Sequence, residues 1–181
     1  MNIKKFIIDK IKNIKKTDKP KIIGIDGPTA AGKTFLSKEL KLLLKKDFKT
    51  IWICQLDWTL KSRAYRTNSL KLFKNENTNF YYESQDHMDL AQIKKTLNRI
   101  NEFDYKKNQS INISLKGLYN RGTATNNLSI STKISKESLI IVEGHYTSIT
   151  ELDGVIDYNI LLLAEKKELL KRKINRVKHY R

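Results

Sequence analysis

The sequence predicts an α/β fold in which a mostly parallel central sheet is covered by helices on both faces. Four short segments are apolar almost throughout, as the strands of a sheet buried on both faces usually are. They are residues 21–25, 50–56, 138–144 and 157–163. Longer segments between and around them repeat their apolar residues at helical spacing. Strands that alternate with helices in this way are typical of a parallel sheet.

The whole-chain properties are those of one globular domain. A chain of 181 residues with 39% hydrophobic residues can bury a core of its own. Cys54 is the only cysteine, which excludes an internal disulfide and favours a reducing compartment. No apolar run approaches the length that crosses a membrane. We therefore expect a cytoplasmic protein without a membrane span.

The chain is strongly basic, with a formal net charge of +17 from 36 Lys and Arg against 19 Asp and Glu. Such a charge could attract nucleic acid, an acidic membrane surface or phosphorylated small molecules. The excess is concentrated in residues 1–21 and 165–181, where aromatic residues do not alternate with the lysines as base stacking would require. A solvated basic surface is therefore favoured, and nucleic acid is not the expected partner.

The first half of the chain begins with a helical pattern. Residues 2–16 carry isoleucines at helical spacing, so residues 1–19 are expected to form a basic N-terminal helix and residues 20–181 the main domain. A strand over 21–25 precedes a helix over 33–46, and a second strand covers 50–56. Residues 59–83 are polar and are expected to be irregular.

The second half continues the alternation. Residues 86–100 predict a helix, because Leu90, Ile93, Leu97 and Ile100 share one face. Residues 111–115 and 127–132 alternate like half-buried strands on either side of a loop over 116–126. After the last two apolar strands, a basic helix is expected to run to the end of the chain.

A phosphate-binding motif lies between the first strand and the helix that follows it. Gly27-x4-Gly32-Lys33-Thr34 matches the Walker A pattern, with Pro28, Thr29, Ala30 and Ala31 between the glycines. In this context the loop amides and the helix N-terminus cradle phosphate oxygens. Lys33 would contact the β and γ phosphates and Thr34 would hold magnesium. The motif predicts a nucleoside triphosphate site, with ATP and Mg²⁺ as cofactors.

Two carboxylates follow buried strands. Asp57 comes after the second strand and Glu143 after the third, and in open α/β sheets the site lies beyond the carboxyl ends of the strands. An acid near the γ-phosphate can support the metal or accept a proton from an attacking hydroxyl. Glu143 is the expected metal-side acid. Asp57 is either the proton acceptor or a helix cap.

Several segments together resemble one family. "GIDGPTAAGKTFLS", the acid after the second strand, "YYESQDHMD", a tyrosine loop, "IVEGHY" and "LLKRKINRVKHYR" occur in the order seen in the uridine kinase and phosphoribulokinase group. The resemblance covers about residues 20–181, and the Walker loop and the "VEG" segment are its specific parts. It implies a three-layer P-loop NTPase fold. It also implies a kinase that phosphorylates a hydroxyl of a small molecule, of nucleoside or sugar type.

The resemblance also implies roles for single residues. Asp57 would accept the proton of the acceptor hydroxyl, and Glu83, or Asp86 as the alternative, would hold the hydroxyls of the acceptor. Tyr119 falls where the family has a tyrosine against the base of the substrate. Ala124 replaces a family histidine, which disfavours pyrimidine recognition.

The terminal helix resembles the family helix that leads into a lid over the phosphates. Arg172 and Arg176 lie one turn apart and would neutralise the transferring group. Family members continue through the lid to a last strand, so the domain is expected to be incomplete at this end.

Two other functions stay open at this point. One is a P-loop NTPase that uses water as acceptor, although no Asp-x-x-Gly follows the third strand. The other is a basic regulatory domain that binds a nucleotide. The expected partner is a small-molecule acceptor, and a homo-oligomer is left open.

Overall fold

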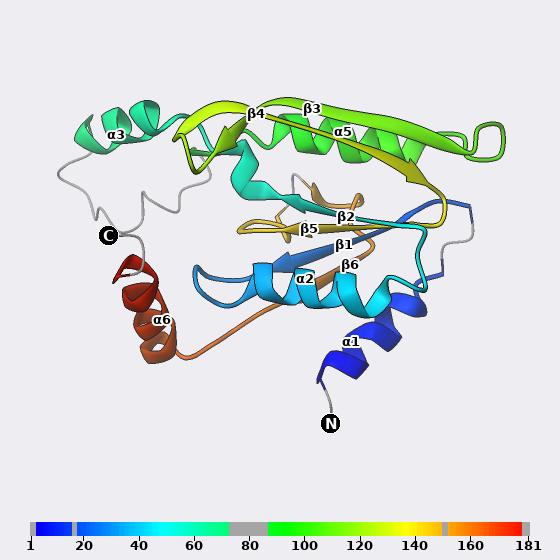
Figure 1. The fold of residues 1–181 in the computed structure, drawn as a ribbon, viewed down its shortest axis with the longest axis horizontal. Helices are drawn as coiled ribbons and strands as arrows, with labels where there is room; N and C mark the ends of the chain where they lie inside the picture. Colours follow the sequence, from blue (N-terminus) through cyan, green and yellow to red (C-terminus); the bar gives the residue numbers. More distant parts are fainter. Residues whose placement is uncertain (1–2, 16–17, 73–86, 150–151, 179–181) are drawn as a thin grey trace.

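The computed structural model describes residues 3–15, 18–72, 87–149 and 152–178. Three layers are visible in Figure 1, with the central sheet between two helices on one side and a helix and a β-hairpin on the other. The predicted α/β fold with a parallel central sheet is confirmed. No helix in the described part of the chain has both the length and the apolar character needed to span a membrane.

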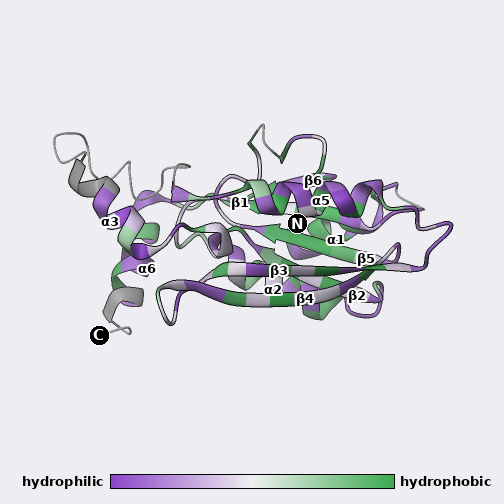
Figure 2. Ribbon diagram, turned by 90° about the horizontal axis from the view of Figure 1, so that it is seen from above, coloured by the Kyte–Doolittle hydropathy of each residue, from purple (hydrophilic) through white to green (hydrophobic). Residues whose placement is uncertain are grey.

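The central sheet has four parallel strands in the order β2-β5-β1-β6. These are β1 (Lys21–Asp26), β2 (Thr50–Gln55), β5 (Ser138–Glu143) and β6 (Tyr158–Leu161). Every residue of β5 is buried, as expected for a strand covered on both faces and paired on both edges. Figure 2 shows the hydrophobic residues concentrated on β1 and β5. The strands of this sheet were predictable from the sequence because they are apolar almost throughout.

Apolar side chains pack on both faces of this sheet. On one face, α1 (Ile3–Lys12) and α2 (Lys33–Leu44) bury residues against β1 and β5, among them Ile7, Ile11 and Leu40. On the other face, α5 (Ala91–Glu102) buries Ile93, Leu97 and Ile100 in a second cluster. Burial of each such side chain contributes about 1.5–3 kcal/mol. The N-terminal helix is thus part of the core packing, and its expected extent of residues 2–16 is too long.

The hairpin of β3 (Ser110–Asn120) and β4 (Thr125–Ser135) forms a separate antiparallel sheet. The loop expected over 116–126 is wrong, since only the short turn between Asn120 and Thr125 lies outside the strands. A register irregularity between Leu115 and Leu118, next to Gly117 at φ 67°, interrupts the in–out alternation. The pairing of β3 with β4 continues to Asn120, although the alternating pattern in the sequence ends at Leu115.

A helix also replaces part of the segment expected to be irregular. After the 3₁₀ turn η1 (Leu56–Thr59), α3 runs over Arg63–Leu72. Its first residues are mostly exposed, so no apolar stripe marks it in the sequence. The helix α6 (Lys166–Lys178) agrees with the expected basic terminal helix. Figure 1 places α3 and α6 at the end of the molecule toward which the strands of the sheet point.

Gly144, directly after β5, is required by a close approach to the first residue of η1. A Cβ at this position would lie 2.6 Å from Leu56 Cβ, and the residue has φ 157°. We expect Gly144→Ala to reduce the free energy of unfolding by about 1–3 kcal/mol, as overpacking does. Gly122→Ala in the exposed hairpin turn, where the nearest atom is Asn120 Oδ1 at 3.3 Å, should change it by less than about 0.5 kcal/mol. Denaturant titration measures both, and equal midpoints would contradict this packing constraint.

Candidate active site

The loop between β1 and α2 has the backbone of an anion site. Gly27, Ala30 and Gly32 have φ values of 143°, 68° and 101°. A Cβ on Gly27 would lie 2.4 Å from the Leu162 carbonyl oxygen, so only glycine fits there. No side chain caps the start of α2, which leaves its first amides for another acceptor. Together these features form a cradle for phosphate oxygens.

Lys33 places its charge inside this loop. The residue is 9% exposed, and its Nζ donates to the carbonyls of Gly27 at 2.7 Å and Pro28 at 3.1 Å. Two backbone carbonyls of the loop thus hold the ammonium group. A phosphate in the cradle would lie beside this positive charge, as the Walker motif predicts.

Glu143 joins three elements at the end of the sheet. Thr34 Oγ1, at the start of α2, donates to the Glu143 carboxylate, with oxygen distances of 2.9 and 3.1 Å. Gln55 Nε2, at the end of β2, donates to Glu143 Oε1 at 2.7 Å. The strand register brings Gln55 and the end of β1 beside Glu143, because Gln55 and Ile25 are both paired with Glu143 in the sheet.

The hydroxyl oxygen of Thr34 and the carboxylate oxygens of Glu143 are suitable ligands for Mg²⁺. Mg²⁺ prefers hard oxygen ligands and usually keeps several waters beside one or two carboxylates and the phosphates. No group of three metal-binding side chains occurs within the described ranges. An ion held at Thr34 and Glu143 would therefore complete its shell with water and phosphate oxygens, and the residues fit that kind of site.

The environment of Glu143 raises the pKa of its carboxyl. Burial is the main cause, and the nearby Asp57 charge adds to it. The hydrogen bonds from Thr34 and Gln55 and the charge of Lys33 act in the opposite direction without reversing the shift. A buried carboxylate with only partial compensation gains from an additional positive charge beside it. A cation bound beside Glu143 would supply this positive charge.

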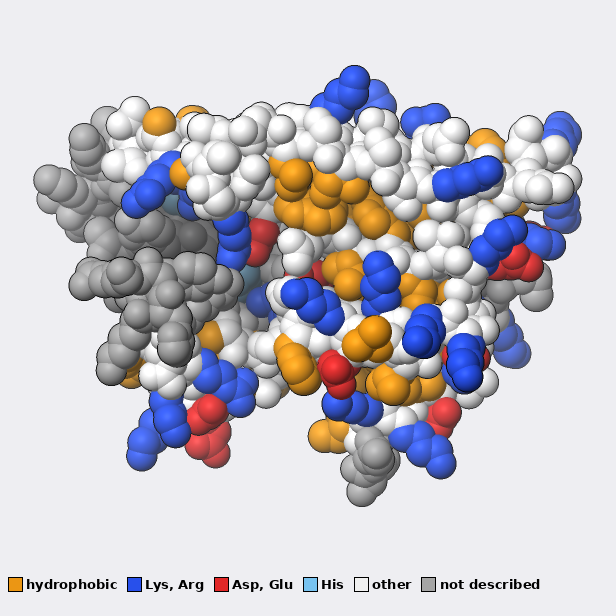
Figure 3. All heavy atoms as spheres, viewed as in Figure 1, with side chains coloured by type: hydrophobic (Ala, Val, Ile, Leu, Met, Phe, Trp, Pro, Cys, Tyr) orange, Lys and Arg blue, Asp and Glu red, His pale blue; other side chains and the backbone are white. Residues whose placement is uncertain are grey.

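These groups open onto a cavity of about 470 Å³ at the carboxyl ends of the strands. Its walls come from the phosphate loop, η1, α3, the hairpin turn, the end of β5 and α6. The lining residues are Thr29, Ala30, Gly32, Lys33, Thr34, Phe35, Asp57, Leu60, Arg66, Met88, Arg121, Glu143, His145 and Arg172. Figure 3 shows basic and acidic side chains close together at this hollow. Phosphate loop and candidate acceptor groups thus share one space.

Asp57 faces this cavity from η1. The 3₁₀ turn buries Leu56 beneath Gly144, so that the next side chain, Asp57, lines the cavity. Arg121 Nη2 in the hairpin turn donates to Asp57 Oδ2 and forms an ion pair with it. The Asp57 side chain remains 36% exposed, so water and small ligands can reach it. The position is compatible with a proton acceptor that Arg121 orients.

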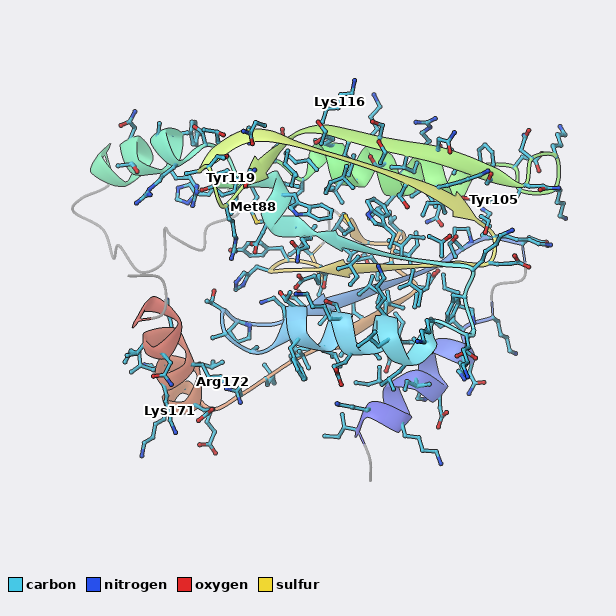
Figure 4. All side chains as sticks on the ribbon, viewed as in Figure 1. Met88, Tyr105, Lys116, Tyr119, Lys171 and Arg172 are labelled. Carbon is cyan, nitrogen blue, oxygen red and sulfur yellow. The ribbon has the colours of Figure 1, made fainter. Side chains whose placement is uncertain are left out.

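Of the other predicted residues, Arg172 lines the cavity. Arg172 on α6 donates to Glu168 at 2.8 Å and reaches the Ala30 carbonyl of the phosphate loop at 3.5 Å. The side chain of Arg176 is outside the described part, as are Glu83 and Asp86. Tyr119 is buried at 6% exposure and does not line the cavity. In Figure 4, Tyr119 and Met88 lie in the layer opposite to Arg172.

The sequence did not single out several residues of this site. Gln55, Arg66, Met88 and Arg121 contact Glu143 or line the cavity, and none belongs to the Walker motif. His145 Nε2 lies 3.0 Å from Thr29 Oγ1 and so connects the end of β5 to the phosphate loop. The position of Gln55 at the end of a buried strand is a signal that could have identified it. Arg66 and Arg121 lie in two segments, 59–83 and 116–126, that the sequence predicted to be irregular or a loop.

The fold of this chain is similar to that of several solved structures. No protein-family model and no curated protein sequence matches the chain. Solved structures do match it. A possible uridine kinase from Bacillus stearothermophilus has a TM-score of 0.69 and 20% identity, with 98% of this chain and 88% of that chain covered. A protein provisionally assigned as a fructose transport system kinase from Silicibacter sp. TM1040 has a TM-score of 0.70 and 14% identity, covering 99% and 83%.

A third match extends the group. Phosphoribulokinase from Rhodobacter spheroides has a TM-score of 0.53 and 11% identity, with 90% of this chain and 66% of that chain covered. The chain therefore has the three-layer fold of P-loop kinases of the uridine kinase and phosphoribulokinase group, as the sequence motifs suggested.

The raised pKa of Glu143 predicts how stability depends on pH without nucleotide or metal. Above the ordinary carboxyl value of 4.5, the folded chain retains the proton that the unfolded chain releases. The free energy of unfolding therefore falls as the pH rises from that value through the raised folded pKa. We expect Glu143→Gln to remove this fall and to be relatively more stable at pH 8 than at pH 4.5.

Denaturant titrations at several pH values measure this difference. Glu137→Gln, which neutralises an exposed carboxylate in the turn before β5, is the matched control and should keep the pH profile of the parent chain. A Glu143→Gln profile parallel to that of the parent would contradict the burial argument.

Proposed function

We propose that this protein is an ATP- and Mg²⁺-dependent kinase that phosphorylates a hydroxyl of a small molecule. The observation that carries the proposal is one cavity that contains the phosphate loop, the Thr34–Glu143 pair and Asp57. A nucleotide site alone would not require a second carboxylate, Asp57, in the lining of the cavity. The kinase fold of the structural neighbours supports the same reading.

In this proposal the loop from Gly27 to Gly32 and the first amides of α2 bind the ATP phosphates. Lys33 neutralises charge on the phosphate that is transferred, because its ammonium group is already fixed inside the loop. Thr34 and Glu143 would hold Mg²⁺, which supplies charge neutralisation and orientation of the phosphate oxygens when bound. Gln55 holds the Glu143 carboxylate in place by its hydrogen bond to Oε1.

Asp57 is the proposed general base. It would accept the proton of the acceptor hydroxyl as the oxygen attacks the γ-phosphate, and Arg121 orients the carboxylate for this step. Arg172 reaches the phosphate loop from α6 and would stabilise charge on the transferring group, together with Arg176. Glu83, or Asp86 as the alternative, remains the proposed ligand of the acceptor hydroxyls. We also propose a cytoplasmic location, where ATP is available.

Replacing Lys33 with Ala should abolish ADP formation from Mg-ATP in the presence of a pool of small-molecule alcohols, nucleosides and sugars. The charge-assisted contact to the phosphates is lost, and such contacts dominate phosphoryl transfer. Lys38→Ala, on the exposed side of the same helix, is the matched control and should keep the parent rate. Equal rates in the two variants would refute the assignment of the phosphate loop.

Replacing Asp57 with Asn should lower the transfer rate by about 10²–10⁴-fold, as loss of a general base does. Binding of Mg-ATP, measured by calorimetry, should remain close to that of the parent chain because Asp57 lies outside the phosphate loop. Asp153→Asn, which removes one exposed acid away from the cavity, controls for the change in charge. Transfer at the parent rate in Asp57→Asn would show that Asp57 is structural.

A further inference from the structure

We infer that the acceptor carries a negative charge, as a phosphate or carboxylate group, and that Arg66 with Arg121 binds this group. The inference rests on the proposed kinase function and specifies its substrate class. Both arginines line the cavity on the side of Asp57, one from α3 and the other from the hairpin turn. Neither belongs to the phosphate loop, and Arg121 pairs with Asp57, the proposed general base.

Arg66 is held in a fixed orientation. Its Nε donates to the Lys61 carbonyl at 3.0 Å, and its guanidinium carbon lies 4.9 Å from the centre of the Tyr119 ring. These two contacts fix the plane of the group. Within the described residues, its terminal nitrogens make no hydrogen bond or ion pair, although the residue is half-buried and lines the cavity. An oriented guanidinium whose two terminal nitrogens have no partner among the described residues matches the geometry of a phosphate or carboxylate.

The charged side chains that line the cavity form two groups, one at the phosphate loop and one on the proposed acceptor side. Lys33 and Arg172 lie at the phosphate loop, where the triphosphate of ATP would compensate them. On the acceptor side, Arg66 and Arg121 line the cavity with Asp57, and Asp57 forms an ion pair with Arg121. Among the described residues, Arg66 forms no ion pair of its own. A negatively charged acceptor would supply its partner.

The same contacts argue against a nucleoside acceptor. The face of Tyr119 that a nucleobase could stack on is covered by the Arg66 guanidinium. Ala124, where the related sequences have a histidine, lies in the hairpin turn and offers no hydrogen-bonding side chain. Leu60 and Met88 supply the apolar part of this wall. A short anionic alcohol fits these groups better than a base and ribose.

Matched pairs of acceptors test the inference: ribose with ribose 5-phosphate, glycerol with glycerate, and uridine with uridine monophosphate. ADP formation should require the anionic member of a pair. Arg66→Met keeps an apolar contact with Tyr119 but removes the donors, and it should lower kcat/KM for that acceptor by about 10–100-fold with the KM for ATP unchanged. Arg63→Met, an exposed arginine one turn earlier on α3, is the matched control and should behave as the parent chain.

A second measurement separates this inference from the proposed function. Calorimetry with inorganic phosphate, with Mg²⁺ and a non-hydrolysable ATP analogue filling the phosphate loop, should detect a further anion site that Arg66→Met weakens and Arg63→Met does not. Such binding without transfer to any acceptor would contradict the kinase function and still support the anion site. Efficient transfer to neutral acceptors would overturn the inference and leave the kinase. Phosphate binding that is absent, or unaffected by Arg66→Met, would also overturn it.

Discussion

The carboxylate of Glu143 accepts hydrogen bonds from Thr34 and Gln55, two residues that lie far from it in the sequence and at the ends of different elements. This arrangement depends on β5 lying between β1 and β2 in a parallel register, which brings the ends of three strands to one edge. The buried position raises the pKa of Glu143, so the carboxyl is costly to ionise unless a cation is nearby. The phosphate loop, which begins at the same edge, can bring that cation together with a phosphate.

The cavity is built outward from this edge. One wall consists of the loop after β1 and the start of α2, and both β1 and α2 bury residues in the core. The other wall comes from η1, α3 and the hairpin turn, which contribute Asp57, Arg66 and Arg121. In the proposed function, phosphate chemistry thus lies at the edge of the sheet and recognition of the second substrate on peripheral elements. Parallel α/β folds commonly divide a site in this way, with loops that vary at the carboxyl ends of the strands.

The sequence was sufficient for the parts of the fold that are buried or covalently local. The apolar strands predicted the sheet, and the Walker motif predicted the position of Lys33 and Thr34. It was insufficient where the signal is spread over distant segments. The pairing of Gln55 with Glu143 depends on strand order, and α3 is too exposed to show a periodic apolar face. The irregularity at Gly117 concealed the length of β3, and with it the turn that brings Arg121 to Asp57.

The fate of the γ-phosphate tests the central claim most directly. ATP labelled in the γ-phosphate can be incubated with the purified chain, Mg²⁺ and the acceptor pool, and the products separated. The proposed function predicts that the label appears in an organic phosphate ester, in an amount equal to the ADP formed, and that it does so only when the acceptor is present. Label released as inorganic phosphate at the same rate with and without the acceptor would contradict the account, because water would then be the acceptor.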